Sequence, residues 1–169
     1  MYEKFFEPGE VTEIRAFGLD GRRKTVWEGF AGGGIVSGYF NNMTDFGRCA
    51  AALDQAGAEG VYFTLNPVLP DLLARSVNRL KGFNNKMKLT SDHEVACLRW
   101  LLVDLDPKRP AGISSSDVEL QNARNLQTKV KAWLVKQDLY QEQELIEAMS
   151  GNGYHLLCPV PGWPVEDEY

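Results

Sequence analysis

The stretch that decides the fold is LRWLLVDLDPKRP, which occupies Leu98–Pro110. Its apolar run, followed by an Asp-x-Asp pair and a proline, predicts a buried β-strand that ends where the carboxylates begin. Pro107 lacks the backbone N–H that a sheet ladder needs, so it marks the end of the strand. Asp104 and Asp106 are two residues apart and are therefore expected on the same face of the strand.

Two carboxylates on one face of a strand can hold a divalent cation. Their oxygen atoms suit Mg²⁺ or Mn²⁺ better than zinc. The same pair can also do no more than solvate the end of a strand or cap the segment that follows it. Asp104 and Asp106 are therefore candidate metal ligands, and the pair alone does not decide between these two interpretations.

The composition indicates one globular domain, residues 1–169, with a sizeable core. A net charge of −5 argues against a protein that coats nucleic acid nonspecifically, but it allows a local basic groove. No stretch has the length and apolarity of a membrane span or a signal peptide, so we expect a soluble, cytoplasmic protein. The three cysteines, Cys49, Cys97 and Cys158, form no CxxC pair and are expected to be small buried apolar residues in a reducing compartment.

The N-terminal part of the chain alternates strand and helix patterns. Residues 11–17 predict a strand that pairs with residues 24–30 through the Asp20-Gly21 turn. Residues 41–44 (NNMT) offer N-cap residues for a helix that ends near Gly57. Residues 60–67 predict a second buried strand, and residues 70–80, with proline in the first turn, predict another helix.

The segment between Leu72 and Ser91 contains basic residues and no acidic ones. In a protein of net negative charge this predicts a local patch suited to phosphates, although a solvated loop would show the same charge pattern. The possible nucleic-acid contacts of this segment are Arg75, Arg79, Lys81, Lys86 and Lys88.

A helix is expected after the central strand, because Ser116 and Glu119 have the spacing of a capping box. Its apolar face is predicted at helical spacing, with Leu120, Ala123, Leu126, Val130, Trp133 and Leu134. Residues 145–149 and 154–158 then predict two strands joined by the turn Ser150–Gly153. The prolines from Pro159 onward predict that the second strand ends there.

Two of these segments together resemble the archaeo-eukaryotic primase superfamily, in particular the primase-polymerase domains of phages, plasmids and bacterial mobile elements. Leu101–Pro110 is similar to the metal-binding Asp-x-Asp motif of that family, and Ser150–His155 (SGNGYH) is similar to its SGxGxH motif. Tyr62–Pro67 also resembles a strand that recurs upstream in these domains. The likeness runs from about Gly38 to Cys158. The order and spacing of the motifs across a capped helix are more specific than either motif alone.

The resemblance implies an α+β fold, in which an RRM-like antiparallel sheet with flanking helices is joined to an N-terminal αβ unit. Asp104, Asp106 and His155 would then converge on one face of the sheet. The implied activity is that of a DNA primase-polymerase, which transfers a nucleotide from an NTP or dNTP to a primer 3′-hydroxyl on a DNA template. The implied partners are single-stranded or primed DNA and a fused or associated helicase.

The resemblance also implies roles for individual residues. Asp104 and Asp106 would hold Mg²⁺ or Mn²⁺ ions, which stabilise the attacking and leaving oxygens. His155 would donate a hydrogen bond to the triphosphate of the incoming nucleotide. The turn and the residues after the acidic pair would assist at phosphate or template, and these are Ser150, Gly151, Gly153, Lys108 and Arg109.

One feature departs from the family pattern, because the family carries a third acid on a strand well past the histidine. Glu166, Asp167 and Glu168 lie in a proline-rich tail and are interpreted as solvated terminal charges, not as that ligand. We therefore expect this chain to be the N-terminal part of a larger primase or primase-helicase. We also expect residues 1–169 alone to have an incomplete activity.

Two other functions are compatible with the sequence. One is a noncatalytic domain of the same fold that binds nucleotides or nucleic acid. The other is a phosphohydrolase of the haloacid dehalogenase type, in which an Asp-x-Asp pair supplies a nucleophile and an acid. The prolines that follow Asp106 and the lack of a doubly wound pattern count against the phosphohydrolase.

Overall fold

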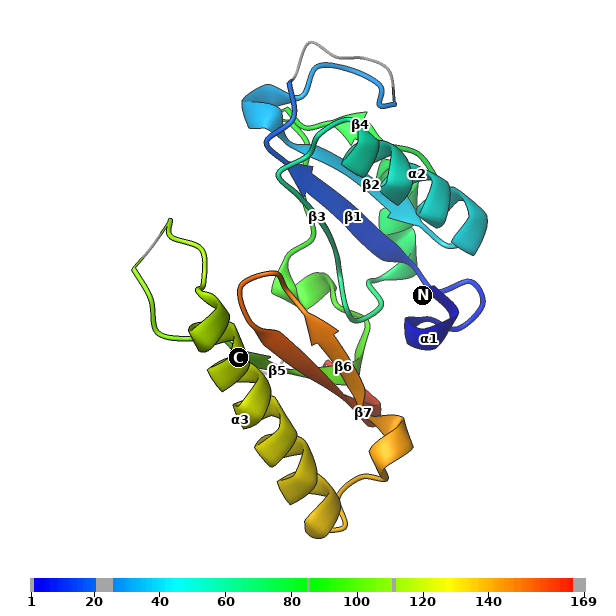
Figure 1. Ribbon diagram of the computed structural model, residues 1–169. Helices are drawn as coiled ribbons and strands as arrows, with labels where there is room; N and C mark the ends of the chain where they lie inside the picture. Colours follow the sequence, from blue (N-terminus) through cyan, green and yellow to red (C-terminus); the bar gives the residue numbers. More distant parts are fainter. Residues whose placement is uncertain (1, 21–25, 85, 111, 166–169) are drawn as a thin grey trace. The chain divides into compact units, whose positions relative to one another are not determined.

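The computed structural model describes residues 2–20, 26–84, 86–110 and 112–165. The chain divides into two compact units (Figure 1). The first is built from the chain up to Arg99 together with the described residues from Gly162 on, and the second is Trp100–Pro161. The sequence predicts a single domain, and this stays a prediction.

The first unit contains a four-stranded antiparallel sheet in the order β3-β1-β2-β4. Its strands are β1 (Thr12–Phe17), β2 (Val36–Phe40), β3 (Gly60–Phe63) and β4 (Lys81–Gly82). In the register of the central strand, Ile14 lies opposite Gly38 on β2 and opposite Phe63 on β3. Side chains alternate between the two faces, so Ile14 and Glu13 lie on opposite sides of this sheet.

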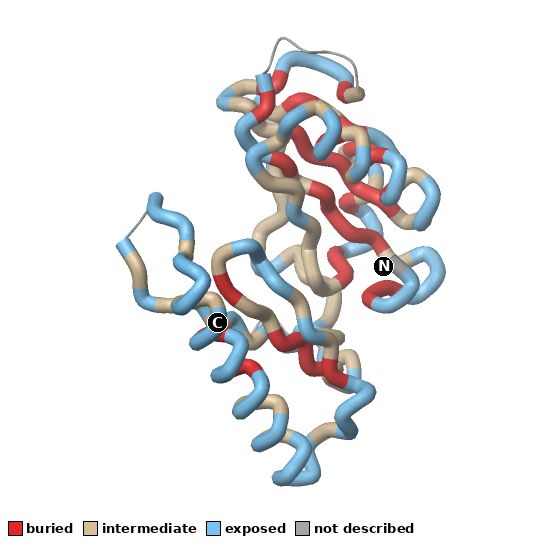
Figure 2. The backbone as a smooth tube through the Cα atoms, in the orientation of Figure 1, coloured by how far each residue is buried: buried red, intermediate tan, exposed pale blue. Residues whose placement is uncertain are grey.

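Helix α2 (Met43–Gln55) packs on the Ile14 face of the sheet (Figure 1). The Asn42 side chain accepts a hydrogen bond from the Asp45 backbone N–H, so the helix is capped within the expected segment, residues 41–44. From this helix, the Phe46 ring contacts the rings of Phe40 and Phe63. Figure 2 shows the resulting core as a run of buried residues along β1 and β2. The short helix α1 (Tyr2–Phe5) precedes β1.

The expected hairpin partner of β1 is wrong in the part that the structure describes. Lys24 and Thr25 lie outside the described residues, and residues 26–30 form no strand. The Glu28 N–H instead donates to the Leu80 carbonyl oxygen, and the Gly82 N–H donates to the Glu28 carbonyl oxygen. The segment therefore lies along the β4 region, and β1 pairs with β2 and β3.

The expected helix over residues 70–80 is also wrong beyond its first turns. A 3₁₀ helix covers Pro70–Arg75, and Asn78 then has a φ of 50° in the left-handed region. The Tyr39 N–H donates to the Ser76 carbonyl oxygen, and the Asn78 N–H donates to the Tyr39 carbonyl oxygen. Pairing with β2 therefore takes the hydrogen bonds that a longer helix would use. The other 3₁₀ helices are Gly32–Gly34, Asp92–Glu94 and Glu142–Glu144.

The second unit contains most of a three-stranded sheet in the order β5-β7-β6, in which residues 97–99 of β5 and 162–164 of β7 belong to the first unit. Its elements are β5 (Cys97–Leu105), α3 (Asp117–Lys136), β6 (Ile146–Met149) and β7 (Tyr154–Pro164). Strands β6 and β7 pair antiparallel, with Ala148 opposite His155. Because β7 lies between β5 and β6, and α3 connects those two, the arrangement is a split βαβ unit.

Helix α3 begins with the predicted capping box between Ser116 and Glu119. Its buried positions are Ala123 and Gln127, and Val130 and Leu134 pack against the cluster of Leu145, Leu156 and Cys158. The expected core positions Leu126 and Trp133 are wrong, with exposed fractions of 49% and 56%. The buried stripe runs through positions 123, 127, 130 and 134, and each of the two exposed residues precedes a stripe residue by one, about 100° around the helix.

Strand β5 is not buried as the apolar run predicts. Leu98, Leu101 and Leu102 are exposed, and Val103 is the β5 residue that packs against the core of this unit. Leu98 and Leu102 lie on the face opposite Val103, away from α3, while Leu101 shares the face of Val103 and is exposed on the end strand of the sheet order. A strand needs neighbours on both faces to bury both of its faces, whatever its composition.

Strand β7 continues through Pro159 and Pro161, so the expected end of this strand is wrong. The register with β6 reaches only from Tyr154 to Leu157. The prolines lie beyond that section, so their missing N–H groups remove no bond of the β6–β7 ladder.

The described elements make a mixed α+β structure with antiparallel strands, which confirms the expected α+β class. Cys49 and Cys158 are buried as expected, while Cys97 is half-buried, and all three are free thiols. Among the described residues, no helix has the length and apolarity needed to cross a bilayer.

The decrease in the free energy of unfolding at low pH is expected to depend on Glu94. Its carboxylate accepts from the Arg75 guanidinium and from the Ser91 N–H and hydroxyl, which lowers its pKa from 4.5 to about 2. A lowered pKa stabilises the folded state above pH 4.5, and this stabilisation is lost as the pH falls towards about 2. We expect Glu94→Gln to reduce the free energy of unfolding at neutral pH by about 1–3 kcal/mol, and by much less in acid.

The matched control is Glu28→Gln. Glu28 lies 3.6 Å from Arg79, and the side chains of both residues are more than half exposed. An exposed ion pair of this kind contributes little, so chemical denaturation at neutral pH should hardly change. Equal losses in the two variants, or an unchanged decrease at low pH in Glu94→Gln, would show that the Arg75 pair does not stabilise the fold.

Candidate functional site

The acidic pair and the histidine of the second motif lie side by side in the second unit. Asp104 is near the end of β5, and His155 is the second residue of the neighbouring strand β7. The His155 Nε2 atom is 3.4 Å from Asp104 Oδ1. Both side chains are partly exposed, so a ligand can reach them. Two segments about fifty positions apart in the sequence therefore supply one polar cluster.

Asp106 joins this cluster through a close approach to Gly153. A Cβ atom added at Gly153 would lie 2.0 Å from Asp106 Oδ1 and 2.9 Å from the Leu105 carbonyl oxygen. Such distances are far inside van der Waals contact, so only glycine at this position allows the observed place of Asp106. The SGxGxH segment thus touches both acids, one through His155 and the other through Gly153.

The turn before β7 is held by its own hydrogen bonds. The Ser150 N–H donates to the Gly153 carbonyl oxygen at 3.1 Å, and the Gly153 N–H donates to Ser150 Oγ at 3.0 Å. Gly151 has a φ of 94°, which favours glycine. The Gly153 N–H therefore bonds within the turn. Of the turn amides expected to assist at a phosphate, this one already has an acceptor.

Two positioning contacts of this site were not predicted. Gln127 is buried on α3, and its Nε2 donates to the His155 carbonyl oxygen at 2.7 Å. Asn152 Oδ1 accepts from the Ser115 N–H at 3.1 Å, and the Ser115 hydroxyl donates to the Asn152 carbonyl oxygen at 2.6 Å. The sequence signal for Gln127 is its position, at helical spacing between Ala123 and Val130 on the apolar face. A buried amide at such a position needs a hydrogen-bond partner.

Arg109 lies next to the acidic pair. Its Nη2 is 4.0 Å from Asp106 Oδ2, and its Nη1 donates to the Ile113 carbonyl oxygen at 2.7 Å. Its Nε atom is buried and has no hydrogen-bond partner among the described residues. The neighbouring Lys108 is exposed. Arg109 therefore places a partly shielded positive charge beside Asp106, where an anionic ligand would meet it.

The donor set at the site is two carboxylates and one imidazole. Within the described residues, no group of three or more histidine, cysteine or acidic side chains has the geometry of a metal site. Mg²⁺ often binds through one or two carboxylates, with waters and substrate phosphates filling its other positions. Asp104 and Asp106 therefore fit a cation that shares its coordination with a phosphate ligand, and they do not make a closed structural site.

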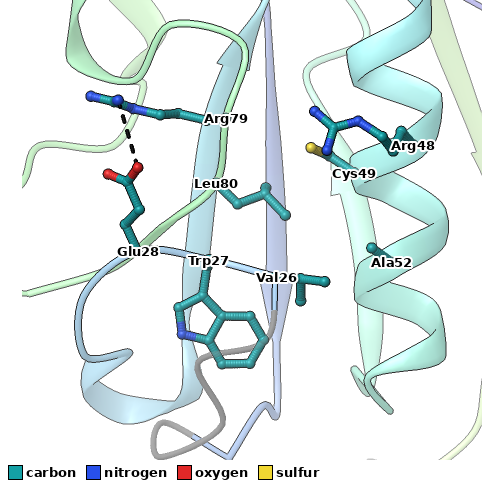
Figure 3. A pocket seen from close by; sticks show the side chains of 8 residues that line it. All are labelled: Val26, Trp27, Glu28, Arg48, Cys49, Ala52, Arg79 and Leu80. Atoms are coloured by element: carbon teal, nitrogen blue, oxygen red, sulfur yellow. Dashed lines mark ion pairs between the residues drawn. The ribbon is translucent and has the colours of Figure 1, made fainter.

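The basic segment of the first unit is largely engaged within the protein. Arg75 pairs with Glu94, and the Lys81 ammonium donates to the Arg75 carbonyl oxygen at 2.7 Å. Figure 3 shows the ion pair of Arg79 with Glu28, at the edge of a hollow of about 320 Å³ whose opposite wall comes from α2. The basic residues of this segment with exposed side chains are Arg79, which pairs with Glu28, and Lys86 and Lys88.

Glu166, Asp167 and Glu168 lie outside the described residues, so their interpretation as terminal charges stays a prediction. Comparisons of the chain with family models, curated proteins and solved structures give no significant match. The site is therefore interpreted from its own geometry and chemistry.

The Gly153–Asp106 contact makes a specific prediction for Gly153→Ala. The added methyl group must displace the Asp106 carboxylate and the Leu105 carbonyl, so we expect Mn²⁺ affinity, measured by calorimetry, to fall about tenfold or more. The control is Gly47→Ala on α2, where a Cβ meets nothing within 4 Å. The control should leave Mn²⁺ binding unchanged and raise stability by up to about 1 kcal/mol. Unchanged Mn²⁺ affinity in Gly153→Ala would separate Gly153 from the site.

Proposed function

We propose that this chain carries the acidic pair and the histidine of a DNA primase-polymerase site, which transfers a nucleotide from an NTP or dNTP to a primer 3′-hydroxyl. The observation that carries the proposal is the 3.4 Å distance between Asp104 Oδ1 and His155 Nε2. These two residues belong to the two segments that resemble separate motifs of one family. Their meeting on adjacent strands is what a shared nucleotide site requires.

The polar side chains of the cluster have complementary tasks in this proposal. Asp104 and Asp106 hold the cation, and a bound Mg²⁺ or Mn²⁺ supplies positive charge to the reacting phosphate and lowers the barrier to in-line attack. His155 donates a hydrogen bond from its imidazole to a triphosphate oxygen. Arg109, 4.0 Å from Asp106, adds positive charge that favours the same anionic ligand.

The positioning contacts support these tasks. Gln127 fixes the backbone of His155, and the Asn152–Ser115 bonds hold the glycine turn that touches Asp106. Side chains that act on a transferring phosphate must be placed within a fraction of an ångström. The buried Gln127 amide on α3 and the hydrogen-bonded glycine turn provide such placement, and in this proposal neither contacts the ligand.

The topology is consistent with the RRM-like sheet that the resemblance implies. A β-α-β-β-α-β fold begins with a split βαβ, and β5, α3, β6 and β7 make that arrangement. The resemblance also implies a third acid on a later strand. We therefore propose the full activity for a longer protein, with a helicase fused or associated, and metal-dependent nucleotide binding for this chain.

The two other functions are separable from this one. A noncatalytic nucleotide-binding domain would bind NTP but would support no primer extension even in the longer protein. A doubly wound phosphohydrolase needs a parallel sheet with helices on both faces. The antiparallel pairings β1–β2, β1–β3 and β6–β7 favour the primase-polymerase over the phosphohydrolase.

Removing both carboxylates is the first test. We expect Asp104→Asn with Asp106→Asn to weaken Mn²⁺-dependent NTP binding by more than about tenfold, because amides replace the charged oxygen ligands. Asp54→Asn with Asp138→Asn, two exposed positions on other surfaces, is the matched control and should bind like the wild type. Wild-type NTP affinity in the first double variant, or wild-type primer extension by it in the longer protein, would refute the proposal.

The histidine is tested separately. We expect His155→Ala to weaken NTP affinity about tenfold, the cost of one hydrogen bond to a charged group, while the affinity for template DNA stays near the wild-type value. His93→Ala is the control, because His93 is exposed and its Nε2 lies 3.2 Å from the Ser91 hydroxyl. Equal NTP affinities in wild type and His155→Ala would contradict the triphosphate role.

A further inference from the structure

A second site of distinct chemistry lies on the four-stranded sheet of the first unit, on the face opposite α2. A hollow of about 290 Å³ opens there. Its lining includes Arg15 and Phe17 from β1, Tyr62 from β3, and Thr64, Thr90 and Asp92 from the segments beside them. It contains none of the residues of the Asp104 cluster.

A buried carboxylate organises the floor of this hollow. Glu13 is only 1% exposed, and its oxygens accept from the Ser37 hydroxyl at 2.6 Å and the Thr90 N–H at 3.1 Å. They also accept from Arg15 Nε at 3.1 Å and Arg15 Nη2 at 2.7 Å. Burial opposes ionisation of Glu13, but these hydrogen bonds outweigh it and lower its pKa, so the carboxylate is charged at neutral pH.

The consequence of this arrangement is a fixed guanidinium that is open to a ligand. The two bonds to Glu13 hold Arg15 in one plane, and Nη2 also donates to the Thr90 carbonyl oxygen at 3.4 Å. The side chain keeps 28% of its surface exposed. These bonds use Nε and Nη2, whereas a guanidinium has five N–H donors. The donors on Nη1 can therefore meet acceptors on a molecule in the hollow.

Two aromatic rings stand at the same hollow. Tyr62 is 61% exposed and Phe17 is 36% exposed, and their ring centroids are 5.8 Å apart at an angle of 67°. Exposed aromatic rings beside hydrogen-bonding groups are the usual platform for an unpaired base, because every base has a flat π-face. A base therefore matches both the rings and the polar floor.

The charges of the lining distinguish a base from a bare anion. Glu13 and Asp92 outnumber Arg15, so the hollow has no excess positive charge for an isolated phosphate. Two exposed basic residues, Lys86 and Lys88, precede Thr90 in the sequence. Because Lys86 and Lys88 come four and two positions before Thr90, which lines the hollow, they are the candidates to meet the backbone phosphates of a strand whose neutral base occupies it.

We propose that this hollow binds an unpaired base of a single-stranded nucleic acid, which stacks on the Tyr62 ring beside Phe17 and accepts hydrogen bonds from Arg15. Lys86 and Lys88 hold the adjoining phosphates. The choice of a nucleic acid strand rests on the proposed function, while the shape and chemistry of the hollow are independent of the Asp104 site.

The decisive experiment measures the fluorescence anisotropy of a labelled oligothymidylate about twelve nucleotides long, with the full chain and with EDTA present. We expect Tyr62→Ala to weaken binding about tenfold, the effect of one lost base-stacking platform. Trp133→Ala on α3, of similar exposure, is the matched control and should bind like the wild type. Thermal unfolding of each variant verifies folding. Undiminished binding by a folded Tyr62→Ala variant, or no binding by the wild type, overturns the proposal.

The phosphate contacts have their own signature. Lys86→Ala with Lys88→Ala should weaken binding and reduce the slope of log K against log salt by about 1.4, the value for two contacts to a single strand. Lys129→Ala with Lys136→Ala on α3 should leave the slope unchanged. An unchanged slope in the first pair would remove these lysines from the strand path and overturn that part of the proposal.

The Asp104→Asn, Asp106→Asn variant separates this inference from the proposed function. It should keep full oligothymidylate affinity in EDTA, even though it loses metal-dependent NTP binding. Loss of oligothymidylate binding in this variant would place the strand at the acidic pair and overturn the inference. Competition by free thymidine monophosphate at concentrations equal to the oligonucleotide would also overturn it, because a free nucleotide would then be the ligand.

Discussion

The position of β7 beside β5 is the constraint on which the candidate site depends. Because the two strands are neighbours, His155 comes within 3.4 Å of Asp104. The turn before β7 then brings Gly153 against Asp106, at a distance that leaves no room for a Cβ. A shift of β7 along β5 by one residue would turn His155 to the face covered by α3 and separate it from the acids. The register of β7 and the glycine at position 153 together bring Asp104, Asp106 and His155 into one cluster.

Buried polar groups hold residues of both candidate sites in place. In the second unit, Gln127 fixes the His155 backbone from α3. In the first unit, Glu13 is almost fully buried and fixes Arg15 at the floor of the hollow. Removing one partner of such a contact leaves a buried group without its bond, which costs more than the bond itself contributes. Each of these contacts therefore restrains the residue that it holds.

The parts of the fold that follow local rules were predictable. The caps at Asn42 and Ser116 begin α2 and α3 where the sequence placed them, because a cap needs only residues three positions apart. The two strands joined by the glycine turn pair antiparallel as expected, because a short turn forces strand reversal. The helix expected over residues 70–80 failed because β2 competes for its backbone hydrogen bonds, and such competition is invisible to local patterns.

The amino-acid sequence by itself determined where α2 and α3 begin, the turn between β6 and β7, and which two motifs carry polar side chains. Tertiary structure alone decided that the leucines of β5 stay exposed, that Gln127 replaces Leu126 on the buried stripe of α3, and that Arg15 and Tyr62 share one hollow. The physical reason is that burial and strand neighbours depend on contacts between distant segments, whereas caps and turns depend on a few adjacent residues.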